Sequence, residues 1–180
     1  MIKKPKYFKF YKSHRLCKNL FEFNTEYLTA LPIQKYLRHQ GLSYATVEVN
    51  KEVEIPVIGK RYIDFVITWS DTVVWVEYNG YQHIGLVNDA EKYPEDVEAL
   101  KKGLKTNSRL EAQKYRDEKV KEYAKNNNIS LIVYQTPSND KHRTDEFNDD
   151  YLSYRSVKFD LKNAFYTPCY IYNNTRTNYA

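Results

Sequence analysis

Two acidic residues, Asp64 and Glu77, stand in otherwise apolar sequence. Asp64 lies in a run over residues 61–69 and Glu77 in a run over residues 72–78, both rich in β-branched and aromatic residues. Only Ser70-Asp71 separates the two runs, which predicts a β-hairpin with a two-residue loop. With that loop Asp64 faces Glu77 across the pair of strands, with their Cβ atoms about 4.5–5.5 Å apart.

Like charges directly opposite each other destabilise a hairpin, and the apolar neighbours of these acids give the repulsion no structural purpose. A divalent cation between the carboxylates would turn the repulsion into attraction. Mg²⁺ favours one or two carboxylates together with waters and substrate phosphates. Asp64 and Glu77 are therefore candidate metal ligands. The alternative is a longer, asymmetric loop or a one-residue slip, either of which would keep the two acids apart.

A first helix is predicted over residues 24–40, with Gly41 ending it. Pro32 lies inside, so the helix is expected to be kinked or to consist of two short helices joined there. If it continues through Pro32, Glu26 shares the face of Ile33 and Leu37. A carboxylate on an apolar face must be paired, hydrogen-bonded or functional.

A second helix is predicted over residues 108–126, beginning with a capping-box pattern at Ser108. Leu110, Val120 and Ala124 mark its buried stripe. Asp117 lies seven residues from both Leu110 and Ala124, so it falls on the same face. Asp117 is thus a further candidate, and Lys121, one turn on, is the alternative structural partner for it.

His83 follows Glu77 by six residues, beyond a turn at Asn79-Gly80. From there it could reach back toward the acidic end of the hairpin, with Gln82 beside it in a supporting position. An imidazole with a pKa of about 6.5 could take a proton from water near a metal. The alternative is a hydrogen-bonded surface histidine.

The order of expected elements is helix, three strands, helix, strand. The first strand covers residues 44–49 with a continuation to 57, the hairpin supplies two more, and residues 129–134 form a buried strand. This order predicts an α/β fold in which helices flank a mixed central β-sheet. The 180 residues fit one domain. We expect a core over residues 22–136, a C-terminal extension over residues 137–172 and a disordered tail over residues 173–180.

Residues 1–21 form a basic, aromatic segment packed on or leading into that core. Its cations are Lys3, Lys4, Lys6, Lys9, Lys12, Arg15 and Lys18, and it contains no acid. Cations among aromatic side chains suit nucleic acid, which offers phosphates and stackable bases. Lys60 and Arg61 beside the hairpin would add phosphate contacts. The alternative is that the aromatic side chains simply dock on the core.

Cys17 and Cys169 are the only cysteines and lie far apart in the sequence. This spacing favours neither a disulfide framework nor a zinc site, and indicates a reducing compartment. No apolar run approaches membrane-spanning length and no signal peptide is apparent. We therefore expect a cytoplasmic protein without a membrane partner.

Asp64, the string Glu77-Tyr-Asn-Gly-Tyr-Gln-His83 and Arg116-Asp117 ahead of a strand together resemble a known family. The pattern is similar to phage and bacterial nucleases that carry the EDxHD motif. These are similar to very-short-patch-repair endonucleases and belong to the PD-(D/E)xK superfamily. The resemblance covers roughly residues 26–134 and implies a restriction-endonuclease-like fold with an α-β-β-β-α-β core. Asn79 departs from it, because the family usually has Asp there and other PD-(D/E)xK nucleases have Lys.

The resemblance implies a metal-dependent endonuclease that hydrolyses phosphodiester bonds in double-stranded DNA, of homing, repair or structure-specific type. In it, Asp64 and Glu77 hold Mg²⁺, for which Mn²⁺ can substitute, and His83 orients or deprotonates the water. Glu26 and Asp117 complete the motif. A nucleic-acid-binding protein that has lost catalysis on the same fold, and an interaction protein whose acids are accidental, remain alternatives. Whether the protein is a monomer or a homodimer stays open.

Overall fold

The computed structural model describes residues 6–42, 44–79, 109–135 and 152–174. Its strands are β1 (Phe8–Tyr11), β2 (Thr46–Ile55), β3 (Gly59–Trp69), β4 (Thr72–Asn79), β5 (Ser130–Gln135) and β6 (Tyr170–Asn174). Its helices are the 3₁₀ turn η1 (Lys18–Leu20) and the α-helices α1 (Asn24–His39), α4 (Arg109–Asn126) and α5 (Tyr154–Tyr166). No helix within these ranges is long and apolar enough to cross a membrane.

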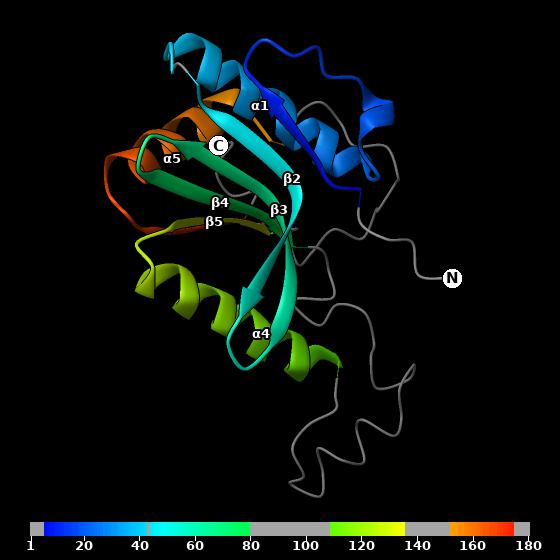
Figure 1. Ribbon diagram of the computed structural model, residues 1–180, viewed down its shortest axis with the longest axis vertical. Helices are drawn as coiled ribbons and strands as arrows, with labels where there is room; N and C mark the ends of the chain where they lie inside the picture. The colour runs from blue at the N-terminus through cyan, green and yellow to red at the C-terminus, as the bar shows by residue number, and fades with distance from the viewer. Residues whose placement is uncertain (1–5, 43, 80–108, 136–151, 175–180) are drawn as a thin grey trace, which may run out of the picture.

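The six strands form one sheet in the order β1-β2-β3-β4-β5-β6. Strands β1 to β4 pair antiparallel, whereas β5 and β6 run parallel to β4. Helices α1 and α5 lie on one face of the sheet and α4 lies on the other (Figure 1). The predicted α/β class with a mixed central sheet is confirmed.

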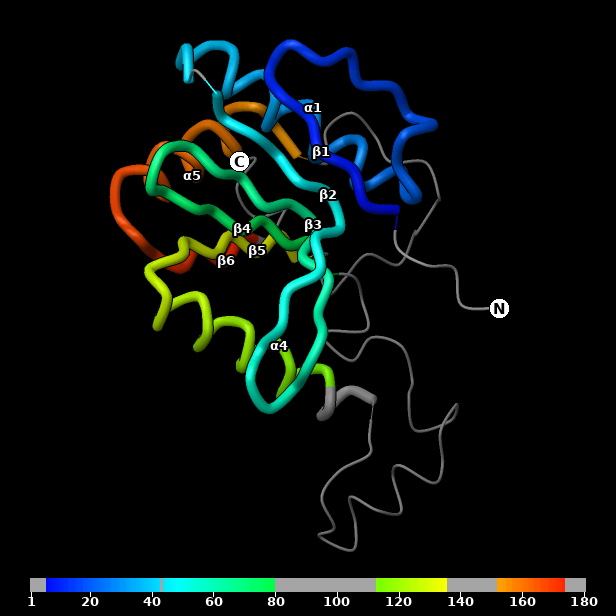
Figure 2. Tube along the Cα trace, viewed as in Figure 1, coloured from blue at the N-terminus to red at the C-terminus, as the bar shows by residue number. Residues whose placement is uncertain are grey.

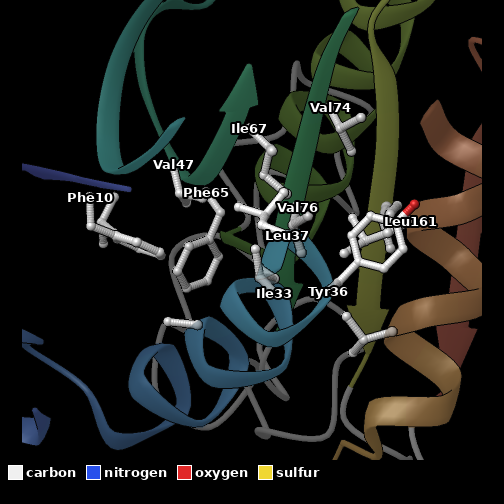
Figure 3. Close-up of a cluster of buried hydrophobic side chains, with 14 of the residues drawn as sticks. Phe10, Ile33, Tyr36, Leu37, Val47, Phe65, Ile67, Val74, Val76 and Leu161 are labelled. Atoms are coloured by element: carbon white, nitrogen blue, oxygen red, sulfur yellow. The ribbon is translucent and has the colours of Figure 1, made fainter. Parts of the chain in front are cut away.

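Each face of the sheet has its own apolar core. The larger core packs α1 and α5 against β1 to β5, and its members include Phe10, Ile33, Leu37, Phe65 and Leu161 (Figure 3). The smaller core joins Val120 and Ala124 of α4 to Trp75, Leu131 and Val133 of the sheet. Val120 and Ala124 are buried as the sequence predicted. Burial on both faces explains why β4 and β5 read as nearly continuous apolar runs.

The β3–β4 hairpin has the predicted register. Trp69 pairs with Thr72, and Ile67 pairs with Val74. Ser70, at the loop, adopts a positive φ of 52°, which matches the twist that tight hairpin loops require. The prediction of a two-residue loop is therefore confirmed.

Of the two predicted alternatives, a kinked helix or two short helices joined at Pro32, the second is wrong, because α1 is a single helix through Pro32. Pro32 itself is buried against the core. Gly41, with a φ of 60°, ends the helical segment as predicted. Because α1 continues through the proline, Glu26 lies on the core face together with Ile33 and Leu37.

Helix α5 and strand β6, which lie in and just after the predicted C-terminal extension over residues 137–172, pack into the sheet and its larger core. Helix α5 packs on the sheet beside α1, and β6 pairs with β5 (Figure 2). The buried Asp160 of α5 accepts hydrogen bonds from Tyr134 Oη (2.9 Å) and Asn173 Nδ2 (2.5 Å). The disordered tail was predicted to begin at residue 173, but residues 173 and 174 belong to β6. The remainder of that tail lies outside the described residues.

The β2–β3 hairpin changes sides of the sheet partway along its length. In β2, Val49 belongs to the larger core but Ile55 belongs to the smaller one, although both positions have the same strand parity. In β3, Phe65 belongs to the larger core and Ile63 to the smaller one. The far end of the hairpin therefore leaves the sheet and extends over α4, as Figure 1 shows.

The change of side occurs at Asn50 and Asp64. These two residues occupy the position between the pairs Val49–Phe65 and Lys51–Ile63, and the register is the same on both sides. No residue has been inserted, so a twist of the backbone makes the change. Asn50 has a φ of 53°, a left-handed conformation that asparagine tolerates better than most residues.

We predict that Asn50→Val destabilises the protein by about 2–3 kcal/mol, because a β-branched residue is strained at positive φ and the side-chain hydrogen bonds are lost. Asn50→Gly keeps the backbone conformation and should cost about 1 kcal/mol. Urea unfolding followed by circular dichroism measures both values. Equal losses for the two variants would show that the backbone conformation of Asn50 carries no strain.

Candidate active site

Asp64 lies at the point where β3 leaves β4. The paired residues of the two strands end at Phe65 and Val76, and the same register continues to Asp64 and Glu77. The Asp64 Oδ2 atom accepts a hydrogen bond from the backbone N–H of Tyr78 at 2.8 Å. The Asp64 side chain therefore accepts the hydrogen bond of a β4 backbone N–H at the point where the β3–β4 pairing stops. This bond fixes the Asp64 carboxylate beside Glu77.

Glu77 and Asp64 are close enough for their carboxyl groups to share a hydrogen bond. Burial raises the pKa of Glu77 well above its ordinary value, and the charge of Asp64 raises it further. Without a cation the pair therefore holds a proton more tightly than an isolated glutamate does. The register of the β3–β4 hairpin thus brings the two acids together, as the sequence predicted.

Glu26 approaches Asp64 from α1. It is 6% exposed, and its Oε2 atom accepts a hydrogen bond from the backbone N–H of Phe23 at 3.5 Å, closing a capping box at the start of the helix. The Asn50 side chain also hydrogen-bonds it. Burial, followed by the charge of Asp64, raises the pKa of Glu26 to about 7.

Asp117 approaches from α4, on the other face of the sheet. Its Oδ1 atom accepts a hydrogen bond from Gln113 Nε2 at 2.8 Å. Its charge contributes to the raised pKa of Glu77. Asp117 is half-buried, on the helix face that its position in the helical pattern predicted. Lys121, its expected partner, places Nζ 4.3 Å from the centre of the Tyr170 ring.

Four acids from four elements thus form a chain of electrostatic neighbours. Glu26 interacts with Asp64, Asp64 with Glu77, and Glu77 with Asp117. Asp64 can neighbour groups from both faces because it sits where the β2–β3 hairpin changes sides. Across the described ranges, no three His, Cys, Asp or Glu side chains are gathered into a ready metal cage. The chemistry available is therefore that of a carboxylate pair with two acidic neighbours.

Several predicted residues lie outside the described ranges. His83 and Gln82 belong to residues 80–108, and Lys3 and Lys4 to residues 1–5. Their proposed roles stay predictions.

The basic N-terminal segment docks part of its aromatic side chains on the core and leaves most of its cations exposed. Phe10 is buried in the larger core through β1, so part of the aromatic content does dock on the core. Tyr7 and Tyr11 are exposed instead. Among the predicted phosphate-binding residues, Lys9, Arg15 and Lys18 are exposed, Lys12 is half-buried, and Lys6 is exposed with its Nζ bonded to Asn19 O at 2.8 Å.

Three supporting groups were not predicted from the sequence: Asn50, Gln113 and the backbone N–H of Tyr78. Gln113 had a detectable signal, because it precedes Asp117 by one helical turn. Asn50 faces Asp64 across β2 and β3, so finding it required the register of a second hairpin. The Tyr78 N–H had no signal in the residue types, because every residue except proline carries that donor.

Comparison of the chain with family models, curated proteins and solved structures gave no match.

We predict that Glu26→Gln changes the pH dependence of stability of the metal-free protein. Because folding raises the pKa of Glu26 from 4.5 to about 7, the folded state binds the proton more tightly and stability falls as pH rises through that window. The variant keeps an acceptor for the Phe23 N–H but has no proton to lose. Between pH 5 and pH 8 it should lose about 2 kcal/mol less unfolding free energy than the wild type.

Urea unfolding in EDTA at a series of pH values tests this expectation. Glu54→Gln, an exposed glutamate at the far end of β2, is the matched control and should follow the wild-type curve. Parallel curves for wild type and Glu26→Gln would show that Glu26 ionises normally in the folded protein.

Proposed function

We propose that this chain is a divalent-metal-dependent phosphodiester hydrolase that acts as an endonuclease on double-stranded DNA. The observation that carries the proposal is the Asp64–Glu77 pair, in which two carboxyl groups face each other at the end of a buried hairpin with the pKa of Glu77 raised. Such an arrangement costs stability in the absence of a cation. The cost has a rationale if the pair binds one.

The residues present fit Mg²⁺ or Mn²⁺. Mg²⁺ needs only one or two protein carboxylates and takes its other ligands from water and substrate phosphates. Asp64 and Glu77 supply those two carboxylates, and the raised pKa of Glu77 beside the Asp64 charge marks where a cation would relieve the repulsion. When bound, such an ion polarises a phosphate oxygen and lowers the pKa of water.

The remaining residues support the pair. The Tyr78 N–H orients Asp64, and Gln113 orients Asp117. With a pKa of about 7, Glu26 can accept or release a proton near neutral pH, a property suited to water or leaving-group chemistry beside the pair. In the proposal His83 accepts the proton of the attacking water, which is the role its position after β4 predicts.

The second candidate is a nucleic-acid-binding protein without catalysis. Asn79 favours it, because Asn79 stands two residues after Glu77 where a lysine is expected in PD-(D/E)xK nucleases. The backbone O of Asn79 accepts a hydrogen bond from the Gln135 side chain at 3.1 Å. In the proposed enzyme, His83 takes over the role of the missing lysine.

We predict that purified protein nicks or linearises supercoiled plasmid in Mg²⁺ or Mn²⁺. Asp64→Asn and Glu77→Gln should each lower the rate about a thousandfold, since a catalytic metal supplies several kcal/mol of transition-state stabilisation. Asp71→Asn is the matched control, because Asp71 is an exposed carboxylate in the loop of the same hairpin. Gel electrophoresis of timed samples gives the rates.

The control should cleave at the wild-type rate. Plasmid binding without cleavage by the wild type would favour the non-catalytic alternative. Cleavage that survives both Asp64→Asn and Glu77→Gln would remove the carboxylate pair from the mechanism.

A further inference from the structure

Arg61 is a cation whose donors are incompletely used. It is half-buried at the far end of β3, and its Nε atom is buried with no hydrogen-bond acceptor among the described residues. Buried guanidinium donors are normally paired, because an arginine remains charged at all ordinary pH values. An unpaired one indicates that the acceptor comes from a ligand.

The neighbouring Lys60 differs from Arg61 in each of these respects. Its side chain is 69% exposed and its Nζ atom forms an ion pair with Glu52 at 3.2 Å. Successive residues of a strand point to opposite sides, so Arg61 shares the side of Ile63, which packs in the smaller core with α4. The two cations were predicted to act together, but the strand directs only Arg61 toward α4.

Arg116 meets Arg61 from α4. It lies one turn before Val120, which packs with Ile63 in the smaller core. The pKa of Arg61 is lowered by burial and then by the charge of Arg116, while Asp117 raises it. Arg61 therefore lies within electrostatic range of a second guanidinium group and of the Asp117 carboxylate.

Gln113 holds this arrangement in place. Its Oε1 atom accepts a hydrogen bond from Arg116 Nη2 at 2.9 Å, and its Nε2 atom donates to Asp117 at 2.8 Å. A neutral amide thus separates Arg116 from Asp117 by binding both. Arg116 is fixed without having its charge neutralised by Gln113.

We propose that Arg61 and Arg116 together bind a backbone phosphate of the DNA strand that reaches the Asp64–Glu77 pair. Planar guanidinium groups present forked donors that match phosphate oxygens. An anion between the two arginines would remove their repulsion and give the Arg61 Nε an acceptor. Asp117 lies within electrostatic range of both Arg61 and Glu77, so the proposed phosphate site and the acidic pair share this neighbour. The inference rests on the proposed function for its substrate and assigns the residues that position it.

The test measures binding of a fluorescein-labelled DNA duplex to the full chain in EDTA, by anisotropy at several salt concentrations. Arg61→Gln and Arg116→Gln should each weaken binding about tenfold. The double variant should lower the slope of log affinity against log salt by about 0.9, the value for one lost phosphate contact. Arg61→Lys should recover only part of the affinity, because it restores the charge without the fork.

Lys125→Gln is the matched control, since Lys125 is an exposed cation in the last turn of α4, the helix that carries Arg116. It should bind DNA as the wild type does. Thermal unfolding of each variant establishes that it is folded. Wild-type affinity in a folded Arg61→Gln variant would overturn the inference and show that Arg61 is paired within the chain.

Because binding is measured without metal, the inference and the proposed function can fail separately. DNA binding that depends on Arg61 and Arg116, without cleavage in Mg²⁺, would support the phosphate site but reject the proposed nuclease activity. Cleavage by Arg61→Gln and Arg116→Gln at the wild-type rate, with unchanged binding, would do the reverse. Stabilisation of the wild type but not the double variant by inorganic phosphate, without DNA binding, would show a free-phosphate site and overturn the DNA assignment.

Discussion

The repulsion between Asp64 and Glu77 is the constraint on which the organisation of this site depends. An isolated hairpin would relieve it by fraying, because its end carries two like charges in register. Here fraying is prevented by the sheet, since Phe65 and Val76 of the next pair are buried in the larger core. The Tyr78 N–H bond to Asp64 adds a local restraint. The core thus keeps the two carboxyl groups close to each other. The electrostatic repulsion between them lowers stability, and an isolated hairpin would avoid it by fraying.

The twist at Asn50 allows groups from both faces of the sheet to approach the Asp64–Glu77 pair. Because β2 and β3 change sides there, the residues before and after Asp64 pack against different helices. Glu26 of α1 therefore influences the same carboxylate that faces Glu77, whose pKa also responds to Asp117 of α4. The same twist carries Arg61 onto α4 beside Arg116. Acidic and basic groups that lie far apart in the sequence are assembled by one change in strand direction.

The parallel half of the sheet determines where the site lies. Glu77 and Asn79 are at the carboxyl end of β4, beside Val133 and Gln135 at the end of β5. Ligands of open sheets with parallel strands bind beyond these carboxyl ends, where the strands stop and loops begin. Asp160, Tyr134 and Asn173 tie α5 and β6 together at the same end of β5 and β6. These hydrogen bonds join the C-terminal helix and strand to β5, the strand that pairs with β4 at Glu77.

The sequence by itself determined the hairpin, its register and the meeting of Asp64 with Glu77, because a two-residue loop and period-2 alternation are local rules. It also determined the core face of α4 through Val120 and Ala124. It did not determine β1 or β6, since their pairing partners are remote in the chain. Helix α5 does carry an amphipathic pattern, with Val157, Leu161 and Ala164 buried, but the sequence predictions missed it. Nor did it show that α1 continues through Pro32. Only the tertiary structure decided that Glu26 and Asp117 approach the pair from opposite faces and that Arg61 parts from Lys60 to meet Arg116. Both outcomes follow from a backbone twist at Asn50, and a twist depends on what each strand packs against rather than on the residue types along it.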